Sequence, residues 1–409
     1  MTSFIGFILV LMVILLASKF ASWVSIKLGQ PAVLGSLLMG ILLGPTLVDL
    51  THLPFLNNPH LPEVITELGE LGVLLLMFIA GLELHLKDLV GNTKASALAG
   101  VLGVILPVGF GWITGELYGL GLYESLFLGL ILGATSVSIS AQTLMELNML
   151  RSRVGLGLLG AAVFDDILVI LLLSIVLALA SGTGSLVGML LIFGKIVLYL
   201  AASMMIGVHV LPWLSRNIVR LPVSQPAVTL ALIVMLFYAI TSELVGGMAA
   251  ITGTFIAGLM FSRTPEKERI EPGIRSLAYG FFVPVFFVSI GLGINLREIS
   301  GSALILLAVM SVLGIIGKIL GSGLGAKLGG FSTLESIQLG AGMVSRGEVG
   351  LIVATIGANN GFVNADEVSA AIGMVLITTL VTPPLLRWLF KKKEPVAKQE
   401  LSTEKQEGE

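Results

Sequence analysis

Long runs of apolar residues follow one another along almost the whole chain, and they constrain its fold more than any motif does. A helix needs about 20 apolar residues to cross the hydrocarbon core of a bilayer. Only helices and closed barrels satisfy their backbone polar groups there, and these runs lack the alternating pattern of barrel strands. The sequence therefore predicts an all-α polytopic membrane protein of about 13 transmembrane helices, over residues 3–26, 31–49, 66–85, 95–116, 123–147, 155–181, 187–213, 222–243, 247–262, 275–295, 301–325, 333–358 and 367–390.

Composition narrows the classes of function. Of the 409 residues, 56% are hydrophobic and 12% are charged, a balance that excludes a soluble domain. The net charge of −2 argues against nucleic acid as a partner, and we expect the lipid bilayer to surround the chain instead. The absence of cysteine excludes disulfides, thiol catalysis and cysteine metal sites. We expect no cofactor and no enzymatic activity.

The positions of lysine and arginine predict how the chain sits in the membrane. With the N-terminus outside, the loops between the predicted spans place nearly all of these residues on the inner side, and Arg297 is the exception. We therefore expect a multi-pass protein of the inner or plasma membrane, with the N-terminus outside and the C-terminus in the cytoplasm. Residues 391–409 turn to Lys, Glu and Gln, which predicts a short disordered cytoplasmic tail.

Two similar segments indicate an inverted repeat. Residues 81–88 (GLELHLKD) close the third predicted span and residues 291–298 (GLGINLRE) close the tenth, at an offset of 210. If spans 1–6 and 8–13 are repeats joined by span 7, the second repeat crosses the membrane in the opposite direction. Arg297 is then the counterpart of Lys87 on the opposite face. A chance match between short apolar segments is the alternative.

Polar residues interrupt the fifth and twelfth predicted spans. Thr135 and Ser136 lie in the stretch ATSVSIS, and Arg346 and Glu348 lie in the stretch GMVSRGE. Such interruptions at corresponding places in inverted repeats are typical of discontinuous helices that cross at the midplane and bind ions. Alternatively, the hydroxyls bond back to helix carbonyls. Arg346 and Glu348 either neutralise each other or the facing helix ends, or they take part in transport.

Two adjacent carboxylates, Asp165 and Asp166, lie in the middle of an otherwise apolar run over residues 155–179. A charge at this depth costs about 3 kcal/mol, and intramembrane acids usually mark ion pathways. Neighbouring helical residues point about 100° apart, so one carboxylate can face a partner helix while the other faces a cavity. We expect an ion- or proton-binding site, and a neutralised packing pair is the alternative. An intramembrane aspartyl protease needs its two aspartates on facing helices, which argues against that reading.

Lys318 is an isolated cation within the eleventh predicted span. At 1.5 Å per residue it lies roughly 13 Å above Lys327 at the inner interface, and Asp165 lies roughly 18 Å above Arg153. The lysine stem covers the difference. We therefore expect Lys318 to form an ion pair within reach of the paired acids, and snorkelling of Lys318 to the interface is the alternative.

Together these residues resemble a known family. The paired aspartates, Thr135-Ser136, Lys318 and residues 345–350 (SRGEVG) are similar to those of bacterial sodium/proton antiporters of the cation:proton antiporter-2 (CPA2) family, NapA-like branch. The similarity extends from Gln30-Pro31 to Arg387. Kef-type potassium transporters share the pattern of spans, but they typically have one aspartate at this place and carry a cytosolic nucleotide-binding domain.

The resemblance implies a division of residues 1–390 into two moving parts. A core domain, about residues 95–181 and 301–390, would move against a dimerisation domain, about residues 3–85 and 222–295, with residues 187–213 as a linker helix. The resemblance also implies a homodimer. It assigns Na⁺ and proton binding to Asp166 and Asp165 together with Thr135 and Ser136. It also pairs Asp165 with Lys318 and makes Arg346 and Glu348 a charged pair at the crossover.

The activity we expect is secondary active exchange of Na⁺ or Li⁺ for H⁺, by alternating access of an elevator-like core, in pH and sodium homeostasis. A sodium ion and a proton compete for Asp166, so they cannot be bound together. When sodium draws Asp165 away, the freed Lys318 can release a second proton, which predicts electrogenic exchange. A K⁺/H⁺ antiporter, or a K⁺ channel or efflux protein of Kef type, is the alternative.

Overall fold

The computed structural model describes residues 3–54, 56, 59–84, 91–180, 186–218, 222–293, 295, 297 and 301–390. Every regular element in these ranges is a helix. The α-helices are α1 (Ser3–Lys27), α2 (Ala32–Leu43), α3 (Leu61–Glu83), α5 (Thr93–Leu117), α6 (Leu122–Gly133), α7 (Val137–Glu146), α8 (Arg153–Ala180), α9 (Leu186–Ile218), α10 (Pro226–Thr241), α11 (Ala250–Phe261), α12 (Lys267–Leu277), α13 (Val283–Leu292), α14 (Gly301–Leu328), α15 (Thr333–Gly342), α16 (Glu348–Asn359) and α17 (Ala365–Phe390). Single turns of 3₁₀ helix (Leu50–His52) and π helix (Ser242–Gly246 and Ala278–Phe282) accompany them.

The apolar helices make the chain a multi-pass membrane protein. Within the described ranges, ten helical stretches are long and apolar enough to cross a membrane, and three shorter apolar helices lie among them. Each of the 13 predicted spans coincides at least in part with a helix, although the number of complete crossings stays a prediction. Helix α3 begins at Leu61 rather than at the predicted residue 66, because Pro62 in its first turn favours an earlier start.

Parts of two predicted features fall outside the described residues. The segments compared in the inverted repeat include residues 85–88 on one side and residues 294, 296 and 298 on the other, none of which the structure describes. The predicted tail over residues 391–409 lies outside as well. The repeat and the tail therefore stay predictions.

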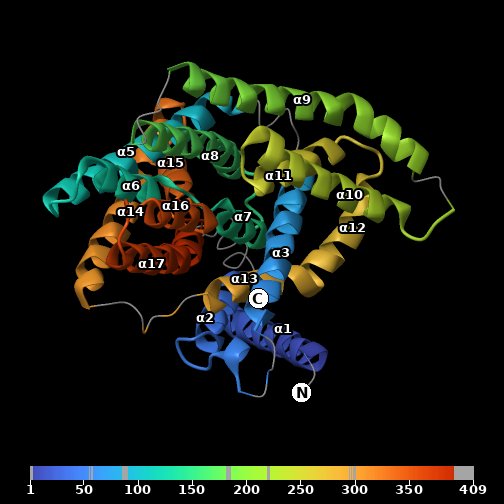
Figure 1. The fold of residues 1–409 in the computed structure, drawn as a ribbon. Helices are drawn as coiled ribbons and strands as arrows, with labels where there is room; N and C mark the ends of the chain where they lie inside the picture. Colours follow the sequence, from blue (N-terminus) through green and yellow to red (C-terminus); the bar gives the residue numbers. More distant parts are fainter. Residues whose placement is uncertain are drawn as a thin grey trace, which may run out of the picture.

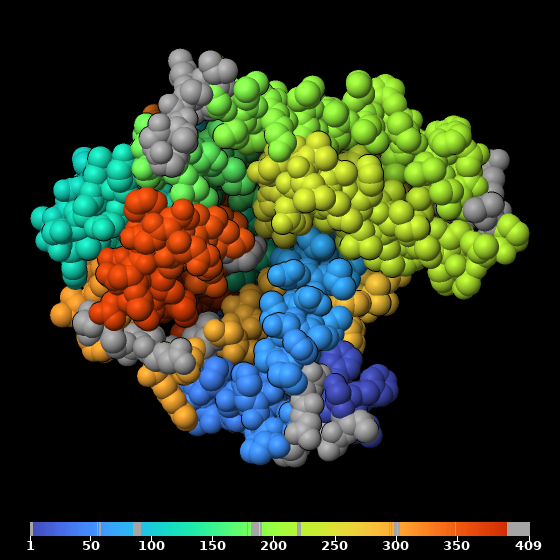
Figure 2. Space-filling model, viewed as in Figure 1, coloured from blue at the N-terminus to red at the C-terminus, as the bar shows by residue number. Residues whose placement is uncertain are grey.

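The helices form two groups (Figure 1). In the first group, α5 packs against α6, α8 and α14, and α14 also contacts α15 and α17. In the second group, α3 packs against α11 and α13, and α2 contacts α1 and α13. Helix α9 runs along one edge of both groups and contacts α8, α10 and α11. Figure 2 shows a recess where the red C-terminal helices approach the blue α3.

A crossing of two glycines holds α3 and α11 close together in the second group. A Cβ atom on Gly81 would overlap the carbonyl oxygen of Phe255, and a Cβ atom on Gly258 would overlap that of Phe78. Small residues let helix backbones approach each other closely in a membrane. This crossing fixes the position of α11, whose first turn faces the candidate site.

Candidate functional site

Both interrupted spans are broken where the polar stretches lie. Helix α6 ends at Gly133 and α7 begins at Val137, while α15 ends at Gly342 and α16 begins at Glu348. The two breaks contact each other. The backbone N–H of Ser136 donates to the carbonyl oxygen of Ser345 at 2.9 Å, and the hydroxyl of Ser345 donates to the carbonyl oxygen of Ser136. Backbone groups freed inside a membrane need such partners, so the hydroxyl-rich stretches stabilise the breaks.

Arg346 is fully buried at the second break. Its Nη1 donates to the carbonyl oxygens of Met343 and Val344 at 3.2 and 3.0 Å, and its Nη2 donates to that of Gly314 at 3.1 Å. The guanidinium therefore neutralises the negative C-terminal end of α15, one of the two structural roles considered from the sequence. The side chain of Glu348 lies outside the described part of the structure. A pairing of Arg346 with Glu348 stays a prediction.

The predicted pair of Lys318 and Asp165 is in contact. The Nζ of Lys318 on α14 donates to Oδ1 of Asp165 on α8, and both side chains are fully buried. The other carboxylate oxygen of Asp165, Oδ2, is buried without a hydrogen-bond partner. Neutralisation by Lys318 allows a second acidic group to lie next to Asp166 in an apolar helix.

Asp166 points toward the second group of helices. The hydroxyl of Thr252, in the first turn of α11, donates to its Oδ2 at 3.0 Å, and both residues are buried. Sequence reasoning missed Thr252, because one threonine in an apolar run usually bonds to its own helix. Adjacent carboxylates on α8 thus take different partners, as the helical angle between them allows.

A small cavity of about 20 Å³ lies beside Asp166. That volume is close to the space of one water molecule. Apart from Asp166 and Thr252, its lining is apolar, with Met77 from α3, Val137 from α7 and Phe255 from α11 among the contributors. The carboxylate therefore faces a narrow space between the two groups of helices.

The predicted hydroxyl ligands lie at the first break. Thr135 and Ser136 are both buried. The Oγ1 of Thr135 has no hydrogen-bond partner, and the Oγ of Ser136 lies 3.1 Å from that of Ser138. An unpartnered buried oxygen is unusual and can serve as a ligand for a cation. In the described ranges, no three His, Cys, Asp or Glu side chains converge as metal ligands, so a cation at Asp166 would rely on such neutral oxygens.

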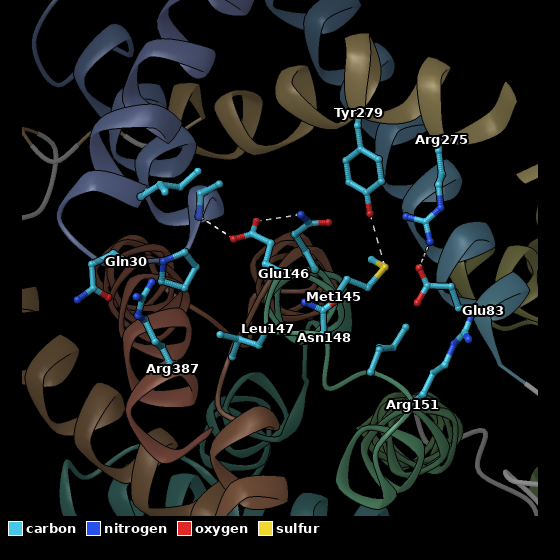
Figure 3. Close-up of a pocket in the computed structure, with 15 residues that line it drawn as sticks. Gln30, Glu83, Met145, Glu146, Leu147, Asn148, Arg151, Arg275, Tyr279 and Arg387 are labelled. Atoms are coloured by element: carbon cyan, nitrogen blue, oxygen red, sulfur yellow. Dashed lines mark hydrogen bonds and ion pairs between the residues drawn. The ribbon is translucent and has the colours of Figure 1, made fainter. Parts of the chain in front are cut away.

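A larger cavity of about 780 Å³ lies between the two groups (Figure 3). Glu146 and Met145 approach it from α7, while Arg275 and Tyr279 approach it from the opposite wall. Arg275 is paired with Glu83, and the hydroxyl of Tyr279 lies 3.5 Å from the sulfur of Met145. Gln142, Met145 and Glu146, in the helix that follows the first break, are among its lining residues.

Glu146 bridges the two groups at this cavity. Its Oε2 accepts a hydrogen bond of 2.6 Å from the backbone N–H of Ala32, in the first turn of α2, and its Oε1 accepts one of 2.9 Å from Gln142. A carboxylate at a helix N-terminus is stabilised by the helix dipole and the unpaired N–H groups there. No sequence pattern predicts this contact, because it joins residues 114 positions apart.

The transmembrane model of sodium/hydrogen exchangers matches residues 8–392 of this chain. The chain belongs to the sodium/hydrogen exchanger family. This membership confirms the resemblance drawn from the paired aspartates and their neighbours. A probable Na⁺/H⁺ antiporter of Bacillus cereus, GerT, is 43% identical over 93% of this chain and 98% of its own length. The Na⁺/H⁺-K⁺ antiporter GerN of Bacillus cereus is 40% identical over 94% of this chain and 96% of its own.

The fold of this exchanger resembles a solved antiporter. The sodium proton antiporter MjNhaP1 of Methanocaldococcus jannaschii superposes with a TM-score of 0.65, covering 95% of this chain and 96% of that one. The two sequences are 18% identical, so the likeness concerns the fold alone.

Proposed function

We propose that this exchanger is a secondary active transporter that carries Na⁺ or Li⁺ in exchange for H⁺, with Asp166 binding either ion in turn. The placement of this carboxylate carries the proposal. It is buried in an apolar helix, and it faces a cavity between two groups of helices. Both ions need the same carboxylate. Exchange therefore follows if the site can turn from one side of the membrane to the other only while Asp166 holds Na⁺ or a proton. The antiporter relatives GerT and GerN support this activity.

We infer that Thr135 and Ser136 complete the ion site. A dehydrated Na⁺ needs several neutral oxygens besides a carboxylate, and the unpartnered Oγ1 of Thr135 supplies one. The contact between the two breaks supports a crossing of discontinuous helices near the midplane, as two inverted repeats would produce. Asp165, held by Lys318, is the second acidic group of the site.

The transport movement we propose is a displacement of one group of helices against the other. The core would comprise about residues 95–181 and 301–390, the dimerisation part about residues 3–85 and 222–295, and α9 would link them. The large cavity between α7 and the wall formed by α2, α3 and α12 supports this division. An elevator-like movement of the core would close this cavity and open another path on the opposite side. A homodimer would hold the dimerisation parts still.

Charge supports the orientation we propose. Arg151, Arg275 and Arg387 line the large cavity, and cytoplasmic ends of membrane helices carry an excess of such residues. The cavity would then open to the cytoplasm, with the N-terminus outside and the chain in the inner or plasma membrane. This is the cytoplasm-open form of the transporter.

We propose electrogenic exchange of two protons for one sodium ion. The contact of Lys318 with Asp165 supports a role for the lysine as the second proton carrier. Sodium at the two aspartates would weaken that contact, and the lysine would then release its proton. When sodium leaves, the ion pair would form again on protonation of Lys318.

K⁺/H⁺ exchange is the second candidate. The relative GerN, an Na⁺/H⁺-K⁺ antiporter, favours it. Reconstitution into liposomes with an imposed pH gradient distinguishes the two. We expect Na⁺ or Li⁺ added outside to dissipate the gradient, followed with a pH-sensitive dye, and K⁺ to have a much smaller effect. Dissipation by K⁺ alone would favour a Kef-type activity, and no dissipation by any of the three ions would refute the proposal.

A further inference from the structure

We propose that Thr252 is a positioning residue of the ion site. It lies on α11 in the second group of helices, whereas Asp166 lies on α8 in the first group. The inference rests on the proposed function and adds a residue to it. The hydroxyl of Thr252 donates to Oδ2 of Asp166 at 3.0 Å. The bond joins α11 of the second group to α8 of the first, across 86 residues of sequence.

Local geometry explains why this hydroxyl turns away from its own helix. Threonine hydroxyls usually bond to a carbonyl three or four residues back, as Thr254 does with Ile251 at 2.9 Å. The corresponding carbonyl for Thr252 belongs to Ala249. That oxygen already accepts from the backbone N–H of Thr252 and from the hydroxyl of Ser242, both at 3.0 Å. A carbonyl has two lone pairs, so the hydroxyl of Thr252 finds a better acceptor in Asp166.

The surroundings make this one bond consequential. Thr252 and Asp166 are 4% and 6% exposed, and they supply the polar side chains of a cavity whose other lining residues are apolar. Hydrogen bonds to a charged group are strong in such low-dielectric surroundings. The bond fixes the orientation of the carboxylate. Because a hydroxyl both donates and accepts, Thr252 can stay in contact with the site when a cation occupies it.

A movement of α8 relative to α11 would break this contact. Thr252 therefore positions Asp166 in the form of the protein that has the large cavity of about 780 Å³. In the form open to the opposite side, the bond from Thr252 to Asp166 would be absent. The consequence is an ion site that binds Na⁺ more tightly on the side where Thr252 contributes. Loss of the hydroxyl should weaken Na⁺ binding there while leaving the rate of switching largely intact.

The test compares Thr252→Val, which keeps the shape and removes the hydroxyl, with Thr252→Ser, which keeps the hydroxyl. Thr254→Val is the matched control, because Thr254 is buried on the same helix and its hydroxyl donates to the carbonyl oxygen of Ile251 in its own turn. In liposomes we expect Thr252→Val to raise the KM for Na⁺ at least about fivefold, the worth of one hydrogen bond, with kcat within about twofold. Thr252→Ser and Thr254→Val should keep the wild-type KM.

A second readout does not depend on transport. Na⁺ should raise the unfolding temperature of the detergent-solubilised wild type, and Thr252→Val should need at least about fivefold more Na⁺ for the same rise. Thr252→Ala takes its place if Thr252→Val does not fold. An unchanged KM in Thr252→Val, or an equal rise in Thr254→Val, would overturn the inference alone. If the wild type neither exchanges nor is stabilised by Na⁺, the proposed function fails and this inference falls with it.

Discussion

Lys318 on α14 donates to Asp165 on α8, while the next residue, Asp166, accepts from Thr252 on α11. The first contact lies within one group of helices and the second joins the two groups. Two adjacent carboxylates are therefore held by different parts of the molecule. One is neutralised inside the proposed core, and the other faces the boundary where the proposed movement takes place.

The buried pair predicts a large loss of stability when its cation is removed. Lys318→Ala leaves Asp165 buried without its counter-charge, which typically costs about 3–5 kcal/mol. We expect a marked fall in the thermal unfolding midpoint in detergent. The double variant Asp165→Asn/Lys318→Ala should lose less stability than the sum of the losses in Asp165→Asn and Lys318→Ala. Lys327→Ala, at an exposed contact with Thr333, is the control and should change little. Additive losses would contradict a coupled pair.

Electrogenic exchange predicts a response to membrane potential. Two protons moving in for one Na⁺ moving out carry one net charge, which a potential of about 100 mV biases by about 2.3 kcal/mol, or about 50-fold in the Na⁺ ratio. In liposomes, an inside-negative potassium diffusion potential should accelerate Na⁺ efflux from the wild type. In Lys318→Gln, if it is folded and active, the acceleration should disappear. Equal rates with and without the potential would indicate one-for-one exchange.

The hydrogen bond from Ala32 to Glu146 should stabilise the form of the protein in which the large cavity is open, so weakening this bond should lower the population of that form. Glu146→Gln replaces a charged acceptor at the N-terminus of α2 with a neutral one, at a cost of about 1 kcal/mol. The chain has no cysteine, so Leu147→Cys at the cavity gives a clean probe. We expect its alkylation to slow by up to about fivefold in the Glu146→Gln background. Glu63→Gln, at an exposed contact with His60, should leave the rate unchanged. Equal alkylation in all backgrounds would contradict a stabilising bridge.

The close crossing of α3 and α11 predicts that replacing Gly258 by a larger residue lowers the stability of the protein. Gly258→Ala places a methyl group against the backbone of Phe78 and forces α3 and α11 apart, at a cost of about 1–3 kcal/mol. Gly194→Ala is the matched control, since nothing lies within 4 Å of the added Cβ in α9. We expect a lower unfolding midpoint for Gly258→Ala and an unchanged or higher one for Gly194→Ala. The reverse order would show that the crossing is loosely packed.

Sequence reasoning succeeded where one residue carries a strong energetic penalty. The apolar runs predicted the helices because a membrane leaves few other solutions, and the buried charges predicted each other because an isolated charge is costly. Depth predicted an ion pair for Lys318, and the family resemblance named Asp165 as its partner. The breaks near Thr135 and Ser345 followed from clusters of hydroxyls in runs that otherwise lack them.

The same reasoning missed contacts that depend on how the helices pack. Thr252 and Glu146 each join helices far apart in the sequence, and neither side chain stands out in its own segment. For Arg346, the sequence alone does not distinguish a side-chain partner from a helix end. In the structure its guanidinium donates to the carbonyl oxygens of residues 314, 343 and 344. These contacts depend on the backbone conformation between α15 and α16, which the sequence does not specify.

The central claim is that Asp166 carries the exchanged ions, and ²²Na⁺ uptake into liposomes driven by an outward proton gradient tests it most directly. Wild type, Asp166→Asn and Thr254→Val would be reconstituted at equal amounts after a check of folding by size exclusion. The account predicts gradient-driven uptake by the wild type and Thr254→Val, and uptake by Asp166→Asn at the level of protein-free liposomes. Gradient-driven uptake by a folded Asp166→Asn variant would contradict the account, because the carboxylate would then be structural.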